Sequence, residues 1–361
     1  MPADLQISPD IHRASTLPGR FYSNAAAFDQ TREVFARSWQ FVGTVDDLRT
    51  PGTLSPLTLL PDFLNEPLLL VRDLEDQIHC LSNVCTHRGV LLAEGRGHAR
   101  FLKCRYHGRR FRLDGRCLGM PEFEQVPDFP SPSDDLPKLG LGQWASLLFA
   151  HLEPQHPFDD FIAPVNQALP GFDHDALKPE PRLSRDYLVR AHWALYCDNY
   201  LESFHVPFVH QSLAEKLDYQ QIGTELFEGG SLQIGMAANE EDALDLPADS
   251  PFHGQKIAAL YFFLFPNLML NFYPWGLSLN LVEPLAVDRT RVRFRAFVHT
   301  PEKLNVGAGS DLDRVEREDE EIVESAQYGT RSRLYRAGRY SPTQERAVHH
   351  FHRQLASQLG T

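Results

Sequence analysis

Short runs of apolar or alternating residues mark the first third of the chain. Four of them cover Trp39–Val42, Thr53–Leu60, Leu68–Arg72 and Ile78–Asn83, and turn-forming Pro, Gly and Asp residues separate them. Alternation with a period of two is typical of strands that bury one face. The pattern therefore predicts a small all-β domain. An amphipathic helix over Asn24–Ser38 is expected to precede it.

The pattern changes after residues 151–185, a proline-rich stretch that we expect to contain no long continuous element. Apolar strands follow at Ile257–Phe265, Leu268–Tyr273 and Leu277–Val282, and residues 311–333 repeat apolar positions at helical spacing. Consecutive antiparallel strands beside a long helix are typical of an α+β domain. The predicted fold class is α+β.

Three segments make up the predicted domain organisation: an N-terminal arm and helix over residues 1–38, the all-β domain over 39–152, and a second domain over 153–361. Hydrophobic residues make up 42% of the chain and charged residues 23%, as in ordinary soluble proteins. No apolar run approaches the ~20 residues of a membrane span, and the N-terminus lacks the features of a secretory signal. We therefore expect a cytoplasmic protein without a membrane partner.

The net charge of −13 disfavours nucleic-acid binding. The five cysteines are an odd and sparse set for so long a chain, which favours reduced thiols over a disulfide framework. Some of these thiols are therefore available as metal ligands.

Two boxes inside the all-β segment mix cysteine and histidine. Cys85 and His87 form C-x-H, and after sixteen further residues Cys104 and His107 form C-x-x-H. A [2Fe–2S] cluster with two thiolates on one iron and two imidazoles on the other needs this supply of ligands. A structural zinc site is the alternative, although zinc fingers usually take both cysteines from one knuckle and both histidines from a helix. Four unrelated residues are the third interpretation.

A second group of candidate ligands lies between Cys197 and His210. A helix that continues to His205 would place Asp198, Glu202 and His205 on one face. Pro207 then interrupts the helix, so His210 can turn back and share a metal with His205. The alternative is a buried helix with hydrogen-bonded polar groups.

Asp319 is the predicted third ligand. It falls between Val315 and Ile322 on the apolar stripe of the long helix, where a carboxylate is costly unless it is paired or bound to metal. The neighbouring glutamates, Glu316 and Glu318 among them, are expected to be solvated. Two histidines and one carboxylate suit an open-sided Fe(II) site. A buried, hydrogen-bonded Asp remains the alternative.

These motifs resemble known families. The two boxes resemble the Rieske motif, which is matched at Cys85, His87, Gly89, Cys104, His107 and Gly108. Val90 and Tyr106 stand where respiratory-chain members carry extra cysteines, and Arg105 stands where the family commonly has proline. The chain also contains Glu-x-x-His-x4-His, from Glu202 to His210, and a late Asp319. With these motifs it resembles the large subunit of Rieske non-haem iron oxygenases, and its motif sequences are most similar to those of choline- and carnitine-oxygenase-like members.

The resemblance implies a helix-grip catalytic domain, a mononuclear Fe(II) held by His205, His210 and Asp319, and a homotrimer. It also implies that Glu202 links the iron histidine to the cluster of a neighbouring subunit, with Asp198 as a supporting residue. A flavin or iron–sulfur reductase would draw electrons from NAD(P)H, and O2 would be the co-substrate.

The leading functional expectation is hydroxylation or oxidative demethylation of a small substrate, with a quaternary ammonium compound as the first candidate. Ring hydroxylation or O-dealkylation of an aromatic acid or ether is the second candidate. A Rieske electron carrier is the rival from another class, but a carrier does not need a second iron site.

Overall fold

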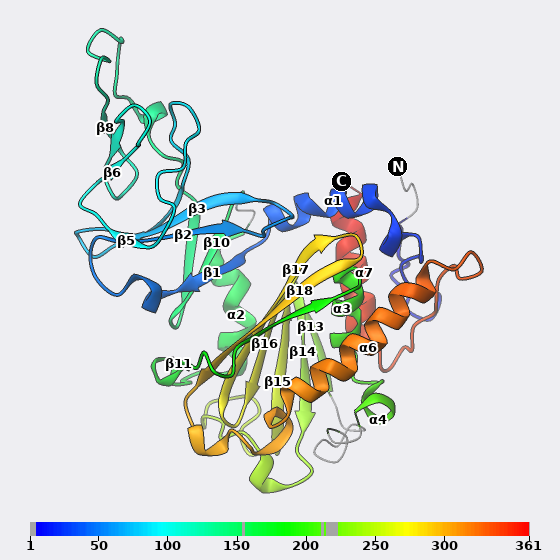
Figure 1. The fold of residues 1–361 in the computed structure, drawn as a ribbon. Coiled ribbons are helices and arrows are strands. Elements are labelled where there is room, and N and C mark those ends of the chain that lie inside the picture. The colour runs from blue at the N-terminus through cyan, green and yellow to red at the C-terminus, as the bar shows by residue number, and fades with distance from the viewer. Residues whose placement is uncertain (1–4, 154–155, 211–212, 214–222, 361) are drawn as a thin grey trace. The chain divides into compact units, whose positions relative to one another are not determined.

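The computed structural model describes residues 5–153, 156–210, 213 and 223–360. It divides the chain into two compact units (Figure 1). The small unit is Ala36–Phe158, and the large unit combines Met1–Phe35 with Asp159–Thr361. The N-terminal segment thus folds together with the C-terminal half of the chain.

The small unit contains three antiparallel sheets, with strand orders β4-β3-β2-β5, β1-β10-β9 and β6-β7-β8. The strands that the alternating pattern predicts are confirmed to within two residues. Their bounds are β1 (Gln40–Thr44), β2 (Thr53–Leu59), β3 (Glu66–Arg72), β4 (Ile78–Ser82), β5 (Gly97–His98), β6 (Leu102–Lys103), β7 (Arg110–Phe111), β8 (Cys117–Gly119), β9 (Gly140–Trp144) and β10 (Leu147–His151).

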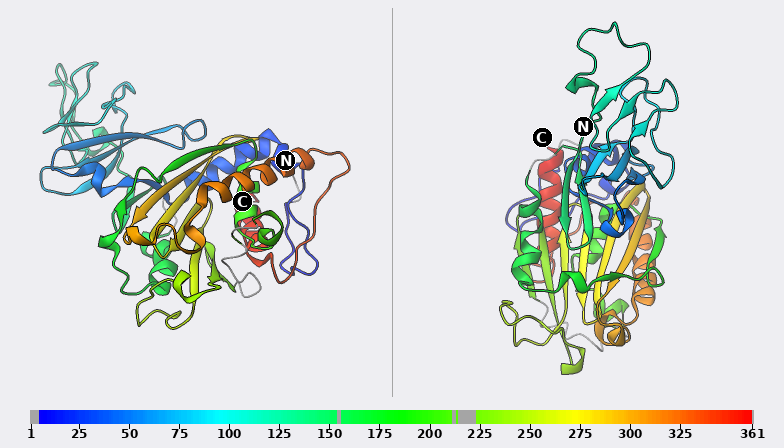
Figure 2. Two further views of the ribbon diagram at one scale, coloured as in Figure 1. Left: turned by 60° about the horizontal axis from the view of Figure 1, so that its bottom comes forward. Right: turned by 90° about the vertical axis from the view of Figure 1, so that its left-hand side faces the viewer.

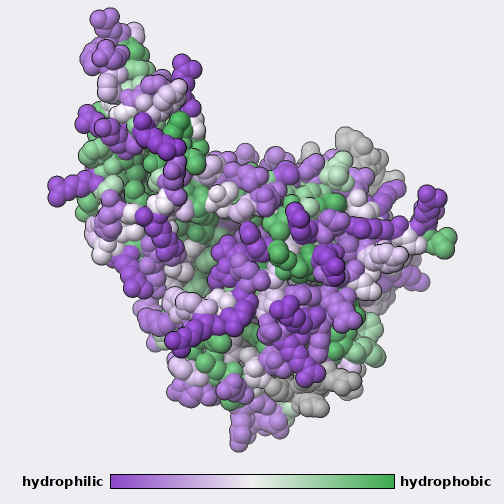
Figure 3. Space-filling model, in the orientation of Figure 1, coloured by the Kyte–Doolittle hydropathy of each residue, from purple (hydrophilic) through white to green (hydrophobic). Residues whose placement is uncertain are grey.

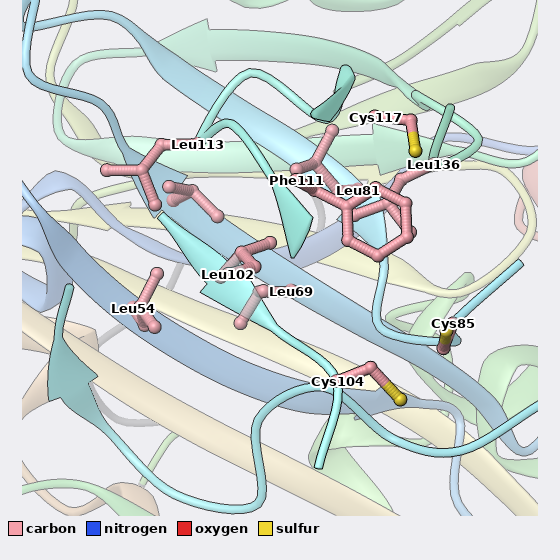
Figure 4. Close-up of a cluster of buried hydrophobic side chains, with 11 residues drawn as sticks. Leu54, Leu69, Leu81, Cys85, Leu102, Cys104, Phe111, Leu113, Cys117 and Leu136 are labelled. Atoms are coloured by element: carbon pink, nitrogen blue, oxygen red, sulfur yellow. The ribbon is translucent and has the colours of Figure 1, made fainter. Parts of the chain in front are cut away.

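A leucine-rich cluster forms the core between two of these sheets (Figure 4). Leu69 and Leu81 come from β3 and β4, and Phe111 comes from β7; each is fully buried. Cys85 and Cys104 belong to the same cluster and lie together at one end of it. The apolar core therefore supports the loops that carry the first set of candidate ligands.

The large unit is built on one antiparallel sheet in the order β11-β18-β17-β16-β15-β14-β13, with β12 also paired to β18. The strand bounds are β11 (Lys178–Pro179), β12 (Arg185–Val189), β13 (Gly223–Phe227), β14 (Gly230–Met236), β15 (Ile257–Leu264), β16 (Leu268–Tyr273), β17 (Gly276–Ala286) and β18 (Arg289–Val298). Figure 2 shows the sheet from two further sides, with its strands side by side.

Helices pack against this sheet. α3 lies against β17 and beside α6, and α7 packs against β13 and β14. The helix bounds are α1 (Ala25–Ala36), α2 (Phe158–Ala168), α3 (Trp193–Tyr200), α4 (Val206–Val209), α6 (Leu312–Thr330) and α7 (Arg346–Leu359). An antiparallel sheet with long helices packed against it confirms the predicted α+β class.

Two sequence predictions about helices are wrong. The proline-rich stretch contains the 11-residue helix α2, with Pro164 inside it. Pro164 removes one helical hydrogen bond, but burial of Ile162 and Val165 on the same helix compensates for that loss. Tertiary packing has overridden the local signal.

The second error concerns the stretch that leads to His205. α3 ends at Tyr200, and the backbone N–H of Leu201 donates to the Cys197 carbonyl. The Glu202 carboxylate then accepts the backbone N–H of His205 at 3.0 Å, which stabilises a separate turn before α4. Asp198, Glu202 and His205 therefore do not share one helical face.

Candidate iron centres

The two cysteine–histidine boxes of the small unit form matching turns. In each box the glycine four residues after the cysteine donates its N–H to the cysteine carbonyl, at 3.0 Å for Gly89 and 3.1 Å for Gly108. Their φ angles are +73° and +74°, in the left-handed region that glycine tolerates at no steric cost. The same local geometry thus presents a cysteine and a histidine twice.

The side chains of these boxes meet in two pairs, cysteine with cysteine and histidine with histidine. Cys85 and Cys104 are each 2% exposed, and burial together with the neighbouring Cys104 thiol raises the pKa of Cys85. The rings of His87 and His107 lie 4.8 Å apart, and Nδ1 of His87 is buried with no hydrogen-bond partner among the described residues. Two thiols and two imidazoles, one of them with an unused buried nitrogen, fit the ligand demand of a Rieske cluster.

The second constellation lies in the large unit. His205 precedes α4, His210 follows it, and Asp319 comes from the middle of α6. Asp319 Oδ1 lies 3.4 Å from His205 Nε2 and 3.0 Å from His210 Nε2. One ligand atom from each residue falls within 4.8 Å of the others. Residues more than a hundred positions apart in sequence thus offer two nitrogens and one oxygen to a common point.

A glutamate holds the far nitrogen of each imidazole. His205 Nδ1 lies 2.7 Å from Glu202 Oε1, and His210 Nδ1 lies 2.8 Å from Glu318 Oε2. Each carboxylate keeps a proton on Nδ1 and leaves Nε2 for the centre, as in carboxylate–histidine–metal arrangements. The donor set and its supports fit a ferrous ion with open coordination positions.

Charge pairing controls the ionisation of these groups. Burial opposes protonation of His205, but hydrogen bonds to Asp319 and Glu202 outweigh it and raise its pKa to about 9. Burial also disfavours ionised Asp319, yet its contacts with both histidines lower its pKa to about 2. The carboxylate is therefore anionic at neutral pH, as a metal ligand must be, whereas His205 has to release a proton before its Nε2 can bind a metal.

The sequence pattern did not predict the roles of two supporting residues. Glu318, expected to be solvated, holds His210, and Asn199 donates its side-chain N–H to Asp319 Oδ1 at 2.6 Å. Glu316 was also expected to be solvated, but it is 3% exposed and accepts the Tyr196 hydroxyl at 2.6 Å. Burial raises the pKa of Glu316 well above its ordinary value.

The apolar stripe predicted for α6 explains these errors. Ile322, predicted to face inward, is 43% exposed, whereas the buried positions include Glu316, Val323 and Gln327. An apolar pattern indicates the buried face only where that face packs on apolar neighbours. Carboxylates recurring around Asp319 at helical spacing were the available signal that this face instead supports a polar site.

Asp198 does not support the iron ligands. One of its oxygens accepts the Tyr22 hydroxyl and the other lies 2.8 Å from His352 Nε2, while Tyr340 binds the opposite nitrogen of His352. No hydrogen bond joins it to the triad within the described part of the chain. Asp198 instead ties the N-terminal segment and α7 to α3.

Aromatic side chains on the helix-facing side of the sheet lie near the end of α3. Tyr200 donates its hydroxyl to Asn271 Oδ1 at 2.7 Å, and Asn271 is the cross-strand neighbour of Tyr261. The rings of Tyr261 and Tyr273 lie 5.9 Å apart, and Trp275 stacks on Tyr273 at 5.5 Å. Tyr273 and Trp275 are buried and Tyr261 is partly buried, and these rings form an aromatic group on the side of the sheet that α3 covers.

Phe262 and Phe272 lie on the opposite side of the sheet from these rings. Residues next to each other in a strand face opposite sides of a sheet, so Phe262 and Phe272 lie on the side away from Tyr261 and Tyr273. Phe272 there contacts Phe172, which follows α2. Core packing accounts for both residues.

Comparison with known proteins identifies the family. Residues 175–361 match the ring hydroxylating alpha subunit (catalytic domain), and residues 38–130 match the Rieske [2Fe-2S] domain. The chain therefore belongs to the ring-hydroxylating alpha subunit family of Rieske oxygenases. It is an oxidoreductase whose cofactors are a Rieske cluster and a mononuclear iron, with O2 and reductase-supplied electrons.

Two relatives show the same similarity over nearly the whole chain. Choline monooxygenase from Arabidopsis thaliana is 29% identical over 95% of this chain and 82% of its own length. The carnitine monooxygenase oxygenase subunit from Escherichia coli (strain K12) is 29% identical over 95% of this chain and 93% of its own. Both names describe monooxygenases.

Solved structures share the fold. The quaternary ammonium Rieske monooxygenase CntA in complex with L-carnitine has a TM-score of 0.76 at 22% identity and covers 99% of both chains. Naphthalene 1,2-dioxygenase from Rhodococcus sp. has a TM-score of 0.73 at 17% identity, over 95% of this chain and 93% of that one. Among the described helices of the present chain, none has the length and apolar character needed to cross a membrane.

Proposed function

We propose that this chain is the terminal oxygenase of a multicomponent monooxygenase and that its substrate is a quaternary ammonium compound. Cys85, His87, Cys104 and His107 hold the [2Fe–2S] cluster in this proposal. His205, His210 and Asp319 hold the mononuclear iron. The two metal groups supply single-electron delivery and dioxygen activation, respectively.

One observation carries the iron assignment. Both histidines direct Nε2 at Asp319 while a glutamate holds each Nδ1. A merely structural histidine pair does not need both far nitrogens anchored by carboxylates beside a third carboxylate. The arrangement orients three donors before metal arrives, which reduces the cost of ordering them at binding.

The aromatic group supports a cationic substrate. Tyr273 and Trp275 are buried and Tyr261 is partly buried, and the faces of such rings attract quaternary ammonium groups by cation–π interaction. Choline and carnitine, named for the two relatives, both carry such a group. An aromatic acid lacks the cation that this surface would select.

We further propose a cytoplasmic homotrimer in which Glu202 links His205 to a cluster histidine of a neighbouring copy, so that electrons pass from that cluster to the iron. Glu202 binds His205 and also lines a surface cavity of about 410 Å³ in the large unit, together with Asp198 and Ile322. One solved relative is described in terms of inter-subunit electron transfer. A flavin-containing reductase that oxidises NAD(P)H completes the proposed system.

Metal content and substrate screening test the proposal. Anaerobically purified protein should contain roughly three irons and about two acid-labile sulfides per chain. With a reductase and NAD(P)H, O2 consumption should rise with choline, carnitine or a related betaine and stay at background with benzoate-type acids. Zinc alone in the protein, or stimulation by aromatic acids only, would refute the proposal.

A further inference from the structure

Arg109 is the one buried arginine or lysine in the described stretch that carries both ligand boxes. The stretch from Cys85 to Cys117 contains nine basic residues, and Arg109, at 3% exposed, is the only buried one. The exposed ones are Arg88, Arg96, Arg100, Lys103, Arg105, Arg110, Arg112 and Arg116. Water and salt screen exposed charges, whereas a buried charge acts through a lower dielectric.

Arg109 connects the two ligand-bearing boxes. Its Nη1 donates to Thr86 Oγ1 at 2.8 Å, and Thr86 lies between the proposed ligands Cys85 and His87. Its backbone carbonyl accepts the N–H of Cys104 at 2.8 Å, so the same residue belongs to the second box. The guanidinium therefore has a fixed position beside both loops.

The surroundings of this charge are largely apolar. The guanidinium carbon lies 5.7 Å from the ring centre of Phe123 and 5.1 Å from that of Phe129. Phe123 in turn packs edge-on against the His87 ring at 5.6 Å. A positive charge thus lies against a partly buried ring that in turn contacts a proposed ligand.

Compensation of the charge is incomplete. Nη2 meets Asp134 Oδ1 at 3.2 Å, but the Asp134 side chain is 21% exposed while that of Arg109 is 4% exposed. The buried Nε of Arg109 has no hydrogen-bond partner among the described residues. Solvent therefore screens the anion more than the cation, and a net positive potential remains inside the small unit.

We infer that the buried charge of Arg109 raises the reduction potential of the cluster that the proposed function assigns to these boxes. Reduction converts one ferric ion to ferrous with one added electron, so the site becomes more negative by one unit. A fixed cation nearby stabilises that product. The same contact with Thr86 positions the loop, so a test must separate charge from geometry.

Potentiometric titration separates them without any substrate turnover. We expect Arg109→Gln to lower the ratio of reduced to oxidised cluster about tenfold at a fixed solution potential. For a one-electron couple, this change means that the reduction potential of the cluster falls by ~59 mV. The titration uses dithionite with redox mediators and follows the Rieske EPR signal. Loss of the exposed cation in Arg112→Gln should change the ratio less than twofold. A comparably small change in Arg109→Gln would overturn the inference.

Arg109→Lys keeps the charge and loses the two-pronged contact. The ratio of reduced to oxidised cluster in this variant should stay within threefold of the wild-type ratio. If instead it falls as far as in Arg109→Gln, loop geometry and not charge sets the potential, and the inference fails.

Asp134→Asn gives an independent result if Arg109→Gln assembles no cluster. It removes the counter-charge while Arg109 remains, so the potential should rise; an unchanged or lower potential overturns the inference. A wild-type protein without acid-labile sulfide would refute the proposed cluster itself. Intact sulfide with unmoved potentials would refute only the role of Arg109.

Discussion

The two proposed metal sites are built in opposite ways. In the small unit, all four candidate ligands lie within one short stretch from Cys85 to His107, on two repeats of one glycine-closed turn. In the large unit, His205 and Asp319 lie over a hundred residues apart and meet only because α6 packs beside α3. A local site depends on turn geometry, whereas a distributed site depends on the whole fold and on neighbours that hold each ligand.

The surfaces of the two units differ less than their sites. Figure 3 shows hydrophilic and hydrophobic side chains mixed over the visible face of the small unit, and mostly hydrophilic ones over that of the large unit. Exposed apolar residues occur in both, such as Tyr106 and Phe208. Surface character would therefore not reveal which unit carries the proposed iron triad.

Removing one ligand from the distributed site should have the largest effect. We expect His205→Ala to abolish product formation and to lower the iron content from roughly three to roughly two per chain, since two donors cannot keep the ion. The visible spectrum of the cluster should remain. Metal analysis and product assays measure both. Loss of the cluster spectrum in this variant would show that the two sites do not assemble independently.

A supporting residue of the distributed site should have the next largest effect. Glu318→Gln removes the charge that holds Nδ1 of His210, and such changes typically weaken metal binding 10–100-fold. Iron affinity can be measured by competition with a chelator. The exposed neighbour Glu321 provides the control, because Glu321→Gln should leave affinity unchanged. Equal effects of both changes would point to general charge loss on α6.

Glycine geometry should decide the stability of the local site. Gly89 and Gly97 both have open space where a Cβ would stand, but only Gly89 has a positive φ, +73°. We expect Gly89→Ala to destabilise the small unit by about 1–2 kcal/mol, the cost of a left-handed non-glycine residue. Gly97→Ala should be nearly neutral. Thermal unfolding followed by loss of the cluster absorbance compares them, and equal shifts would contradict the turn argument.

The smallest predicted effect concerns His192, fully buried at the start of α3. Burial lowers its pKa to about 3, below the ~6.5 of an unfolded chain. The unfolded state therefore binds the proton first, and stability present above pH 6.5 is lost as the pH falls toward 3. Between pH 7 and pH 5.5 the loss should be on the order of 1 kcal/mol.

Chemical unfolding of His192→Asn tests this pH dependence. Asparagine can still accept the backbone N–H of Ala194 that His192 Nδ1 accepts now, so the helix start is preserved. The variant should lose less stability than the wild type over the same pH interval. Parallel losses in the two proteins would show that His192 does not contribute to the acid sensitivity of the large unit.

Sequence alone determined the features that depend on neighbouring residues. The alternating runs predict the strands of both units, and the C-x-H and C-x-x-H boxes place their four ligands on adjacent loops, because turns and strand alternation are local properties. The motif positions and the family resemblance also predicted a triad of His205, His210 and Asp319. The fold brings these three residues together. The sequence did not reveal where α3 ends or that a helix tolerates Pro164.

Only the tertiary structure decided which residues support the ligands. Glu318 binds His210, although the apolar pattern of its helix predicted that another face is buried. Asp198 and Asn199 are neighbours in the chain but have different partners. Asn199 donates to Asp319, whereas Asp198 binds Tyr22 and His352. Long-range packing of α3, α6 and α7 sets these choices, and no periodicity within one segment encodes them. A hydrogen bond is made over a few ångströms, so its partner depends on the completed fold.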